Sequence, residues 1–270
     1  MLVVTSWNIN SVRLRLPQVL RFLEERRPDV LCLQETKCPD DKFPLSEIRK
    51  AGYPHCAIFG QKGYHGVAVF SRLPIDEISS MSFCGKSDAR HMRVRLGPEA
   101  GRAAGIVIHN FYVPAGGDVP DPALNEKFAH KLGFLAEMQA WAEKTRPTVS
   151  PTILVGDLNV APLEHDVWSH KQLLDVVSHT PVETSALEAM REAGGFADAA
   201  RVLTPQPEKI YTWWSYRSPD WAKANKGRRL DHVWLSPDLM TTCRAVEILK
   251  DARGWERPSD HAPVTAVLDL

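Results

Sequence analysis

The sequence predicts an α/β sandwich, in which two β-sheets pack together and helices cover their outer faces. Many short apolar runs of strand length are separated by Gly, Pro and Asp, whereas only a few segments repeat apolar residues at helical spacing. Such an excess of short strands over helices is typical of two packed sheets. The 270 residues contain no Gly/Ser-rich or Pro-rich linker between two halves, so we expect a single domain over residues 1–270.

The first elements alternate strand, helix and strand. Residues 2–7 form an apolar run that predicts a strand. Residues 16–25 place their apolar side chains on one helical face, and Pro17 suits the first turn of that helix. A Pro-Asp pair then ends the helix, and residues 30–33 predict the next strand.

Two further helices and several strands are predicted beyond this point. Residues 121–144 repeat apolar residues near helical spacing and predict a long helix. Residues 185–193 predict a shorter helix, which Gly194 and Gly195 close. The remaining predicted strands are residues 56–59, 67–71, 92–96, 106–113, 153–155, 230–235 and 264–270.

Charge and composition exclude several classes of protein. The chain has 33 basic and 33 acidic residues, so its formal net charge is zero and a nucleic acid would need a local basic face. Five dispersed cysteines form no CxxC pair, which argues against a zinc cluster or a disulfide framework and suits a reduced, cytoplasmic protein. No signal peptide and no apolar run near ~20 residues is present, so we expect no membrane association. Nothing indicates an obligate oligomer, and we expect a monomer.

Four short runs place polar side chains at the end of an apolar stretch. Such an apolar stretch is most simply a buried strand, so these polar residues would sit at the edge of the core. If the ends of these strands converge, their polar side chains would form an oxygen-rich pocket with one imidazole. Such a pocket suits a hard divalent cation and phosphate-ester chemistry. The pattern therefore favours an enzyme over a scaffold. The runs are Ser6-Trp7-Asn8-Ile9-Asn10, Leu33-Gln34-Glu35-Thr36-Lys37, Val155-Gly156-Asp157-Leu158-Asn159 and Ser259-Asp260-His261.

Seven motifs occur in one order along the whole chain. They are Trp7-Asn8-Ile9-Asn10, Leu33-Gln34-Glu35-Thr36-Lys37, Gly63-Tyr64-His65-Gly66-Val67, Asn110-Phe111-Tyr112-Val113-Pro114, Gly156-Asp157-Leu158-Asn159, Arg229-Leu230-Asp231-His232 and Ser259-Asp260-His261. With them the chain resembles the exonuclease III/apurinic endonuclease family of the endonuclease–exonuclease–phosphatase superfamily.

The resemblance implies a DNase I-like two-sheet α/β sandwich with its site at one rim of the sheets. It implies a hydrolase that uses Mg²⁺ or Mn²⁺ to cleave double-stranded DNA 5′ to an abasic site. A 3′→5′ exonuclease and the cleaning of blocked 3′ ends, as a phosphatase or phosphodiesterase, often accompany this activity in the family.

Five residues are predicted to carry the chemistry. Asp157 can accept a proton from water as a general base, although an Asp-Asn pair after a strand is by itself more often an ordinary turn. Tyr112 is the alternative group for activating water, and we favour Asp157. Asn159 would donate to a phosphate oxygen or to the nucleophile. Asp231 would hold His261 as a cation that stabilises charge developing on the phosphate.

Metal binding is predicted for Glu35 above all. A hard cation prefers carboxylate oxygen, but the simpler reading of this residue is a solvated carboxylate that pairs with Lys37. Asn8 and Asn10 lie two apart, so a continuing strand would put them on one face; the resemblance favours Asn8 over Asn10. The full predicted ligand set is Glu35, Asn8, Asp157, Asn159, Asp260 and His261.

DNA contacts are predicted along the same rim. The segment from Tyr211 to Asp231 is both aromatic and basic, which suits a loop that wedges a duplex or forms a pocket for a flipped sugar. The resemblance places Trp213 and Leu230 in that sugar pocket, and Trp221 is the candidate wedge. The predicted DNA-binding residues are Arg13, Lys37, Tyr64, Arg90, Trp213, Trp221, Arg228 and Leu230, and Arg229 is a further basic candidate. Runs of charge are, however, usually just solvated faces.

Two departures from the family pattern concern substrate contacts. Ala115-Gly116-Gly117 stands where many relatives have Asn or Gln, and Arg228 stands where some have an aromatic pocket wall. Two rival functions remain: a phosphatase for a lipid or small phosphoester, and an inactive module that recognises DNA damage. The aromatic and basic loop argues against the first. The second would have lost a catalytic residue, and none is missing.

Overall fold

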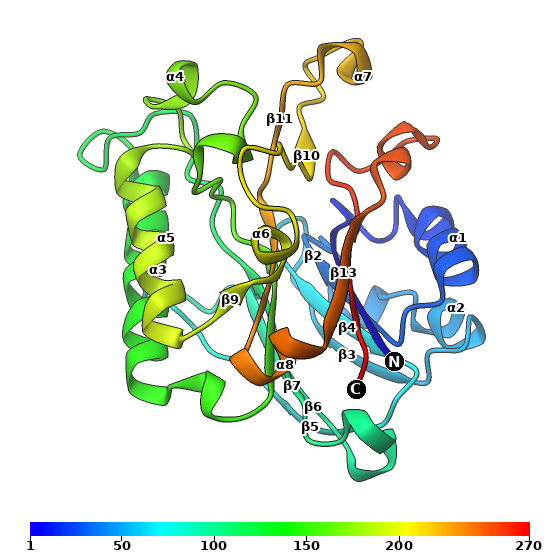
Figure 1. The fold of residues 1–270 in the computed structure, drawn as a ribbon. Helices are drawn as coiled ribbons and strands as arrows, with labels where there is room; N and C mark the ends of the chain where they lie inside the picture. The colour runs from blue at the N-terminus through cyan, green and yellow to red at the C-terminus, as the bar shows by residue number, and fades with distance from the viewer.

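The computed structural model describes residues 1–270 and shows two six-stranded mixed sheets packed face to face (Figure 1). The first sheet has the order β13 (Cys243–Ile248), β14 (Val264–Leu268), β1 (Leu2–Asn8), β2 (Val30–Gln34), β4 (Val67–Ser71), β3 (His55–Phe59). The second has the order β5 (Ile75–Ser79), β6 (His91–Leu96), β7 (Val107–Tyr112), β8 (Thr152–Asp157), β12 (Asp231–Leu235), β9 (Ala197–Asp198). The predicted sandwich is confirmed. A short ribbon of β10 (Trp213–Trp214) and β11 (Gly227–Arg228) lies apart.

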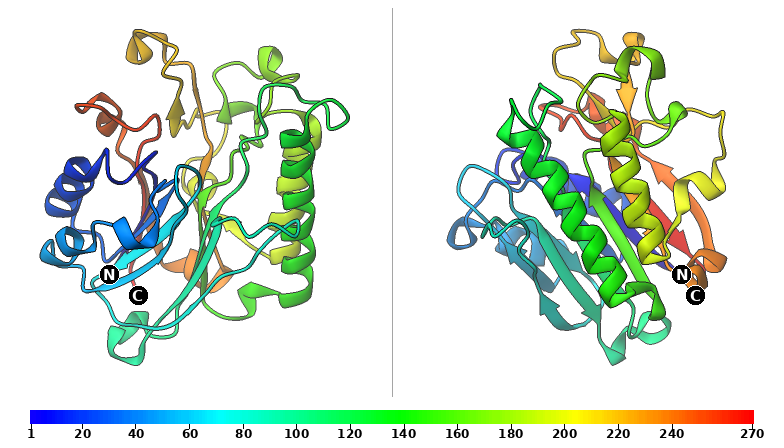
Figure 2. Two further views of the ribbon diagram at one scale, coloured as in Figure 1. Left: turned by 180° about the vertical axis from the view of Figure 1, so that it is seen from behind. Right: turned by 90° about the vertical axis from the view of Figure 1, so that its left-hand side faces the viewer.

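Helices cover both outer faces of the sandwich (Figures 1 and 2). α3 and α5 lie side by side over the second sheet, and α1 and α2 lie on the first. The helices are α1 (Leu16–Arg26), α2 (Leu45–Lys50), α3 (Glu126–Thr145), α4 (His170–Leu173), α5 (Pro181–Gly194), α6 (Ala199–Leu203), α7 (Trp221–Ala224) and α8 (Pro237–Thr242). Short 3₁₀ turns occupy Asp40–Lys42, Pro98–Ala103, Pro147–Val149, Glu164–Asp166 and Lys250–Gly254. No helix is both long and apolar enough to cross a bilayer.

The main core lies between the two sheets. Val4 and Val69 of the first sheet belong to the same buried cluster as Ile108, Val155 and Val233 of the second. The alternate side chains of each strand point outward to the helices, where two further apolar clusters form. Because strands buried on both faces cannot alternate polar and apolar residues, their sequences read as short continuous apolar runs.

The two predicted long helices differ from the structure at their starts. α3 begins at Glu126, not at residue 121, because the side chain of Asn125 accepts a hydrogen bond from the backbone N–H of Lys127 and caps the helix. α5 begins at Pro181, not at residue 185, because Thr180 and Glu183 form a capping box. Edge strands β5 and β13 were not predicted, since their half-exposed residues do not form apolar runs.

Strand direction brings the chemistry-bearing residues to one rim. β1 and β2 are parallel, as are β7 and β8, so each pair ends at the same edge of its sheet. β12 runs antiparallel to β8 and pairs Asp231 with Asp157. β14 runs antiparallel to β1, so the residues that precede it reach the same rim.

A buried polar bridge fixes the spacing of the two sheets below this rim. Gln34 Nε2 donates to Asn110 Oδ1 across 2.7 Å, and Asn110 Nδ2 donates to the backbone oxygens of Leu33 and Ala68. Both side chains are completely buried. Because an unpaired amide would be costly here, the bridge restricts how the sheets can shift against each other.

Candidate active site

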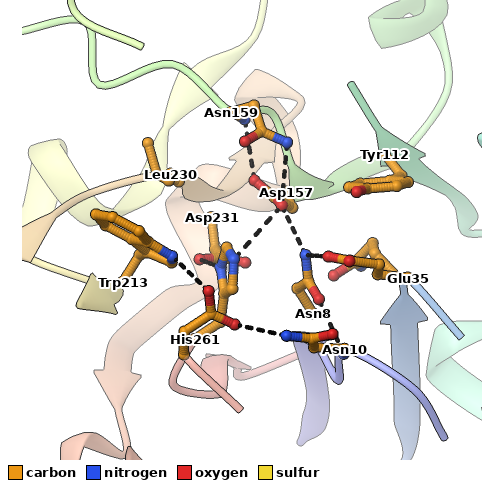
Figure 3. Close-up of polar contacts among 12 residues, drawn as sticks. Asn8, Asn10, Glu35, Tyr112, Asp157, Asn159, Trp213, Leu230, Asp231 and His261 are labelled. Atoms are coloured by element: carbon orange, nitrogen blue, oxygen red, sulfur yellow. Dashed lines mark hydrogen bonds and ion pairs between the residues drawn. The ribbon is translucent and has the colours of Figure 1, made fainter. Parts of the chain in front are cut away.

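The rim forms the floor of a cleft of about 780 Å³. Its lining includes most of the predicted catalytic residues together with an aromatic wall at one side. Figure 3 shows the polar side chains of both sheets pointing toward one another, with Trp213 and Leu230 beside them. The predicted site residues that line the cleft are Glu35, Tyr112, Asp157, Asn159, Trp213, Trp221, Arg228, Leu230, Asp260 and His261.

One imidazole lies between two buried carboxylates at the centre of the cluster. His261 Nδ1 is 2.8 Å from Asp231 Oδ2, and His261 Nε2 is 3.7 Å from Asp157 Oδ2. Burial by itself would lower the pKa of His261, but the charges of Asp231 and Asp157 raise that pKa to about 10. Burial raises the pKa of Asp157 to about 7, against the opposing effect of the charged His261. The predicted role of Asp231 as the partner of His261 agrees with this geometry.

Asp157 is also surrounded by amide donors. Asn8 Nδ2 donates to Asp157 Oδ2 across 2.8 Å and joins the two sheets at this point. The backbone N–H and the side chain of Asn159 donate to the Asp157 carboxylate at 3.0 and 3.2 Å. The expectation that Asp157 and Asn159 share a face required the strand to continue as far as Asn159, and it does not. It ends at Asp157, and Asn159 returns to the carboxylate through a left-handed residue with φ of 53°.

A similar turn places Glu35. This residue follows the last residue of β2 and has a φ of 56°. Its Oε2 accepts from Asn8 Nδ2 at 2.9 Å, and its Oε1 lies 2.7 Å from the ammonium of Lys37. The pairing of Glu35 with Lys37 that the simpler reading expected is therefore present, at the edge of the cleft.

Asn10, which the resemblance favours less than Asn8, also contacts residues of the cluster. Its φ of 48° ends the strand, so it does not share a strand face with Asn8. Its Oδ1 accepts from Lys37 Nζ at 2.8 Å and its Nδ2 donates to Asp260 Oδ1 at 3.1 Å. Asp260 Oδ2 also accepts from Trp213 Nε1 at 2.8 Å. Burial opposes ionisation, yet the His261 charge and these two donors hold the pKa of Asp260 below its usual value.

Tyr112 lies on the opposite side of the floor from His261 (Figure 3). Its side chain is 8% exposed, and burial together with the charges of Glu35 and Asp157 raises its pKa well above the usual value. This shift favours the protonated phenol, which can donate a hydrogen bond.

Arg90 does not lie where a residue that contacts DNA is expected. Its side chain is 6% exposed, pairs with Asp88 at 2.5 Å and donates to the backbone oxygen of Tyr112 at 3.2 Å. Its guanidinium carbon lies 4.9 Å from the centre of the Tyr112 ring. Arg90 thus holds Tyr112 in place through this ring contact and the hydrogen bond to its backbone oxygen. Arg229 is likewise removed from the surface, since it is completely buried between Asp166 and Asp198.

The other predicted DNA contacts divide into two groups. Trp213, Leu230 and Arg228 form one wall of the cleft, and Trp221 lines it from α7. Trp221 packs edge-on against Trp214, with ring centres 5.3 Å apart, and its role as a wedge stays a prediction. The remaining three are not cleft-lining residues: Arg13 and Tyr64 are exposed, and Lys37 is half-buried.

A buried ion pair beneath the cleft was missed by the sequence analysis. Lys131 of α3 and Glu183 of α5 are paired and completely buried. Lys131 Nζ also donates to the backbone oxygens of Asn159 (2.7 Å) and Ala115 (3.3 Å), and Glu183 accepts from the backbone N–H of Ser178 at 3.0 Å. The pair therefore ties three cleft loops together. The available signal was a lysine three residues after Phe128 and four before Leu135, on the apolar face of the helix.

Comparisons with known proteins agree with the geometry. The model of the Endonuclease/Exonuclease/phosphatase family matches residues 5–261. The chain is 31% identical over 267 residues to exodeoxyribonuclease III of Haemophilus influenzae, covering 97% of each protein. It is 30% identical over 268 residues to a DNA-(apurinic or apyrimidinic site) endonuclease of Dictyostelium discoideum, covering 99% of this chain and 70% of that protein.

Solved structures are similar over their full length. An AP endonuclease from Archaeoglobus fulgidus superposes with a TM-score of 0.90 at 33% identity, and each chain is covered completely. The 3′ phosphatase NExo from Neisseria, bound to a product DNA hairpin, gives 0.89 at 30% identity, again with complete coverage. The chain therefore belongs to the endonuclease/exonuclease/phosphatase family.

Proposed function

We propose that this protein is a metal-dependent DNA repair nuclease. It would cleave the phosphodiester backbone 5′ to abasic sites, shorten DNA from 3′ ends and remove blocking groups from them. Relatives named exodeoxyribonuclease III and AP endonuclease, and the fold shared with a 3′ phosphatase bound to DNA, support this assignment. We propose that residues 1–270 act as one domain, while the monomeric state stays a prediction.

The observation that best supports the proposal is the local environment of the Asp157 carboxylate. A buried carboxylate lies at the floor of the cleft, 3.7 Å from a cationic imidazole and within hydrogen-bond distance of two Asn side chains. It is the only predicted site residue with a pKa raised to about 7, which suits a group that accepts a proton near neutral pH.

The side chains then have separable tasks. Asp157 accepts a proton from the water that attacks phosphorus, and the bond from phosphorus to the 3′ oxygen breaks. His261, held as a cation by Asp231, stabilises the negative charge on the phosphoryl oxygens in the transition state. The protonated Tyr112 donates a hydrogen bond from the other side. The Trp213 and Leu230 wall contacts the sugar beyond the scissile phosphate.

The donor set fits Mg²⁺ or Mn²⁺ at Glu35. In the structure the ammonium of Lys37 is held by a carboxylate oxygen of Glu35 and the amide oxygen of Asn10, at 2.7 and 2.8 Å. These oxygens thus already accommodate a cation, and oxygen ligands are what hard divalent ions prefer. Such an ion supplies charge neutralisation at the phosphate. Glu35 would hold it, with Asn8 and Asn10 in support.

A second group of possible ligands is less suitable. One ligand atom each from Asp157, Asp231 and His261 lies within 4.8 Å of the others. The charges of Asp231 and Asp157 raise the pKa of His261 to about 10, however, so a metal ion would have to displace a proton from this imidazole. We therefore propose Glu35 as the principal metal ligand among the predicted set.

The test uses a labelled duplex with one stable abasic analogue, beside an intact duplex and a duplex with a 3′-phosphate. Each is incubated with Mg²⁺ and with EDTA. Metal-dependent incision 5′ to the analogue supports the repair endonuclease, and stepwise shortening without incision makes the protein chiefly an exonuclease. If no DNA is cleaved, the proposed function is wrong and small phosphoesters become the substrates to examine.

A further inference from the structure

Arg228 gives the cleft wall a positive charge. It lies on β11 directly opposite Trp213 of β10, and its guanidinium carbon is 5.3 Å from the centre of the Trp213 ring. Trp213 in turn donates to Asp260 and forms a β-bridge with His261. One indole ring thus separates the guanidinium from the catalytic cluster. A group attached to the scissile phosphate on the side away from the 3′ oxygen would then lie beside both the Trp213 indole and the Arg228 guanidinium.

The guanidinium is held in place by the chain beneath it. Arg228 Nη1 donates to the backbone oxygen of Val177 at 2.9 Å and to Ser178 Oγ at 2.7 Å. The backbone N–H of Ser178 is itself bound by Glu183, whose carboxylate is completely buried with Lys131. The cation is therefore pre-positioned, so a ligand would not have to order it.

No carboxylate forms an ion pair with this cation, although the charge of the buried Glu183 favours its ionised form. Arg228 takes part in none of the ion pairs of the structure, whereas its neighbour Arg229 is paired with both Asp166 and Asp198. Its Nε is buried without a hydrogen-bond partner, and burial lowers the pKa of the guanidinium. A half-buried cation that lines the cleft without an ion-pair partner is suited to an anionic ligand.

We propose that Arg228 recognises an anionic group carried beyond the scissile phosphate at a damaged 3′ end, such as the carboxylate of a 3′-phosphoglycolate. This rests on the proposed nuclease function and specifies its substrate. A guanidinium can pair with a carboxylate through two parallel hydrogen bonds between opposite charges, whereas a neutral abasic sugar offers it no anion. The reaction is hydrolysis of the bond between the 3′ oxygen and phosphorus. Water supplies hydroxyl to phosphorus and, through Asp157, a proton to the 3′ oxygen, and phosphoglycolate leaves.

The experiment compares two blocked 3′ ends that differ in one group. One duplex carries 3′-phosphoglycolate and the other a 3′-phosphoethyl ester, in which a neutral methyl group replaces the carboxylate. A third duplex with an internal tetrahydrofuran site measures incision. The ratio of kcat/KM for the glycolate and ethyl ends is the readout, because it cancels any common loss of DNA binding.

Arg228→Gln removes the charge and keeps a donor, and it should lower this ratio about 10- to 100-fold. Arg228→Lys keeps the charge and should retain most of the ratio. Lys226→Gln is the matched control, because Lys226 lines the same cleft on the same segment and stacks on Trp168. It should leave the ratio within about twofold of the wild type.

An unchanged ratio in Arg228→Gln, with thermal unfolding showing a folded variant, overturns the inference. An equal loss on all three duplexes would assign Arg228 to a backbone phosphate, which also overturns it. In both cases the wild type still cleaves DNA, so the proposed function stands. If the wild type cleaves none of the three duplexes, the proposed function fails and this inference falls with it.

Discussion

His261 Nε2 lies 3.7 Å from Asp157 Oδ2, while Nδ1 of the same ring lies 2.8 Å from Asp231 Oδ2. One imidazole is thus placed between two buried carboxylates that come from neighbouring strands. The two charges keep the ring protonated, and burial keeps the pKa of Asp157 near neutrality. His261 is therefore suited to act as the cation and Asp157 as the proton acceptor, although the two side chains are neighbours in the cleft.

The dependence of activity on pH should change in Asp231→Asn. We expect activity to rise with pH as Asp157 loses its proton, and to fall at high pH as His261 loses its own. The substitution removes a charge that raises the pKa of His261, so the alkaline limb should move to lower pH. Profiles of kcat against pH at fixed Mg²⁺ measure this, with Asp269→Asn as a surface control. An alkaline limb that stays in place would show that His261 is not the group responsible.

Asp157→Asn and His261→Ala should each lower kcat by a factor of ~10²–10⁴, because each removes an acid–base or electrostatic group at the reacting phosphate. Thermal unfolding should show both variants folded. His55→Ala, on edge strand β3 away from the cleft, is the control and should stay close to wild-type activity. Near-normal turnover in either test variant would remove its assigned role.

The buried Lys131–Glu183 pair should be important for stability. Breaking a buried pair by removing one partner leaves an uncompensated charge and costs about 3–5 kcal/mol, so Lys131→Met should lower the free energy of unfolding by that amount. Breaking the exposed Arg244–Asp269 pair with Arg244→Met should cost at most ~1 kcal/mol. Urea unfolding measures both. Equal small losses would mean that the buried pair does not stabilise the cleft loops.

Acid should destabilise the protein between about pH 6.5 and 3, through buried histidines. Burial lowers the pKa of His109 to about 3 and that of His232 to about 4. The unfolded chain therefore binds these protons at a higher pH than the folded chain does. Stability is then complete above the ordinary pKa and is lost as pH falls, by up to ~1.4 kcal/mol per pH unit for each group.

His109→Gln tests this linkage, because it removes one titrating group within the second sheet. The variant should lose less stability than the wild type between pH 7.5 and pH 5, as measured by urea midpoints. Gln can still form a hydrogen bond with His91, which is 3.0 Å from His109 in the wild type. A pH slope equal to that of the wild type would contradict the assignment.

Metal affinity should respond in opposite directions to two substitutions. Glu35→Gln removes the charged ligand and should weaken Mn²⁺ binding at least ~10-fold. Lys37→Met removes the ammonium that occupies the same oxygens and should strengthen binding. Electron paramagnetic resonance of Mn²⁺ without DNA measures both directly, and Glu47→Gln on exposed α2 is the control. Weaker binding in Lys37→Met would argue against a metal at this position.

Much of the architecture was predictable because buried strands leave a strong local signal. The predicted runs at residues 2–7 and 67–71 correspond to β1 and β4, and the polar residues that follow the strands do converge at one rim. The pairing of Asp231 with His261 could also be predicted. Helix starts were less accurate, because a capping interaction such as that of Asn125 depends on a short-range geometry that apolar spacing does not reveal.

By itself the sequence determined the buried strands, the rim and the identities of the polar residues there, since each depends on local composition and order. Only the tertiary structure decided how those residues are used. Left-handed turns at Glu35 and Asn159 redirect their side chains, Arg90 packs against Tyr112, and Arg229 takes the ion pairs that its neighbour Arg228 lacks. These outcomes depend on contacts between segments far apart in the chain, and burial and charge pairing are properties of those contacts.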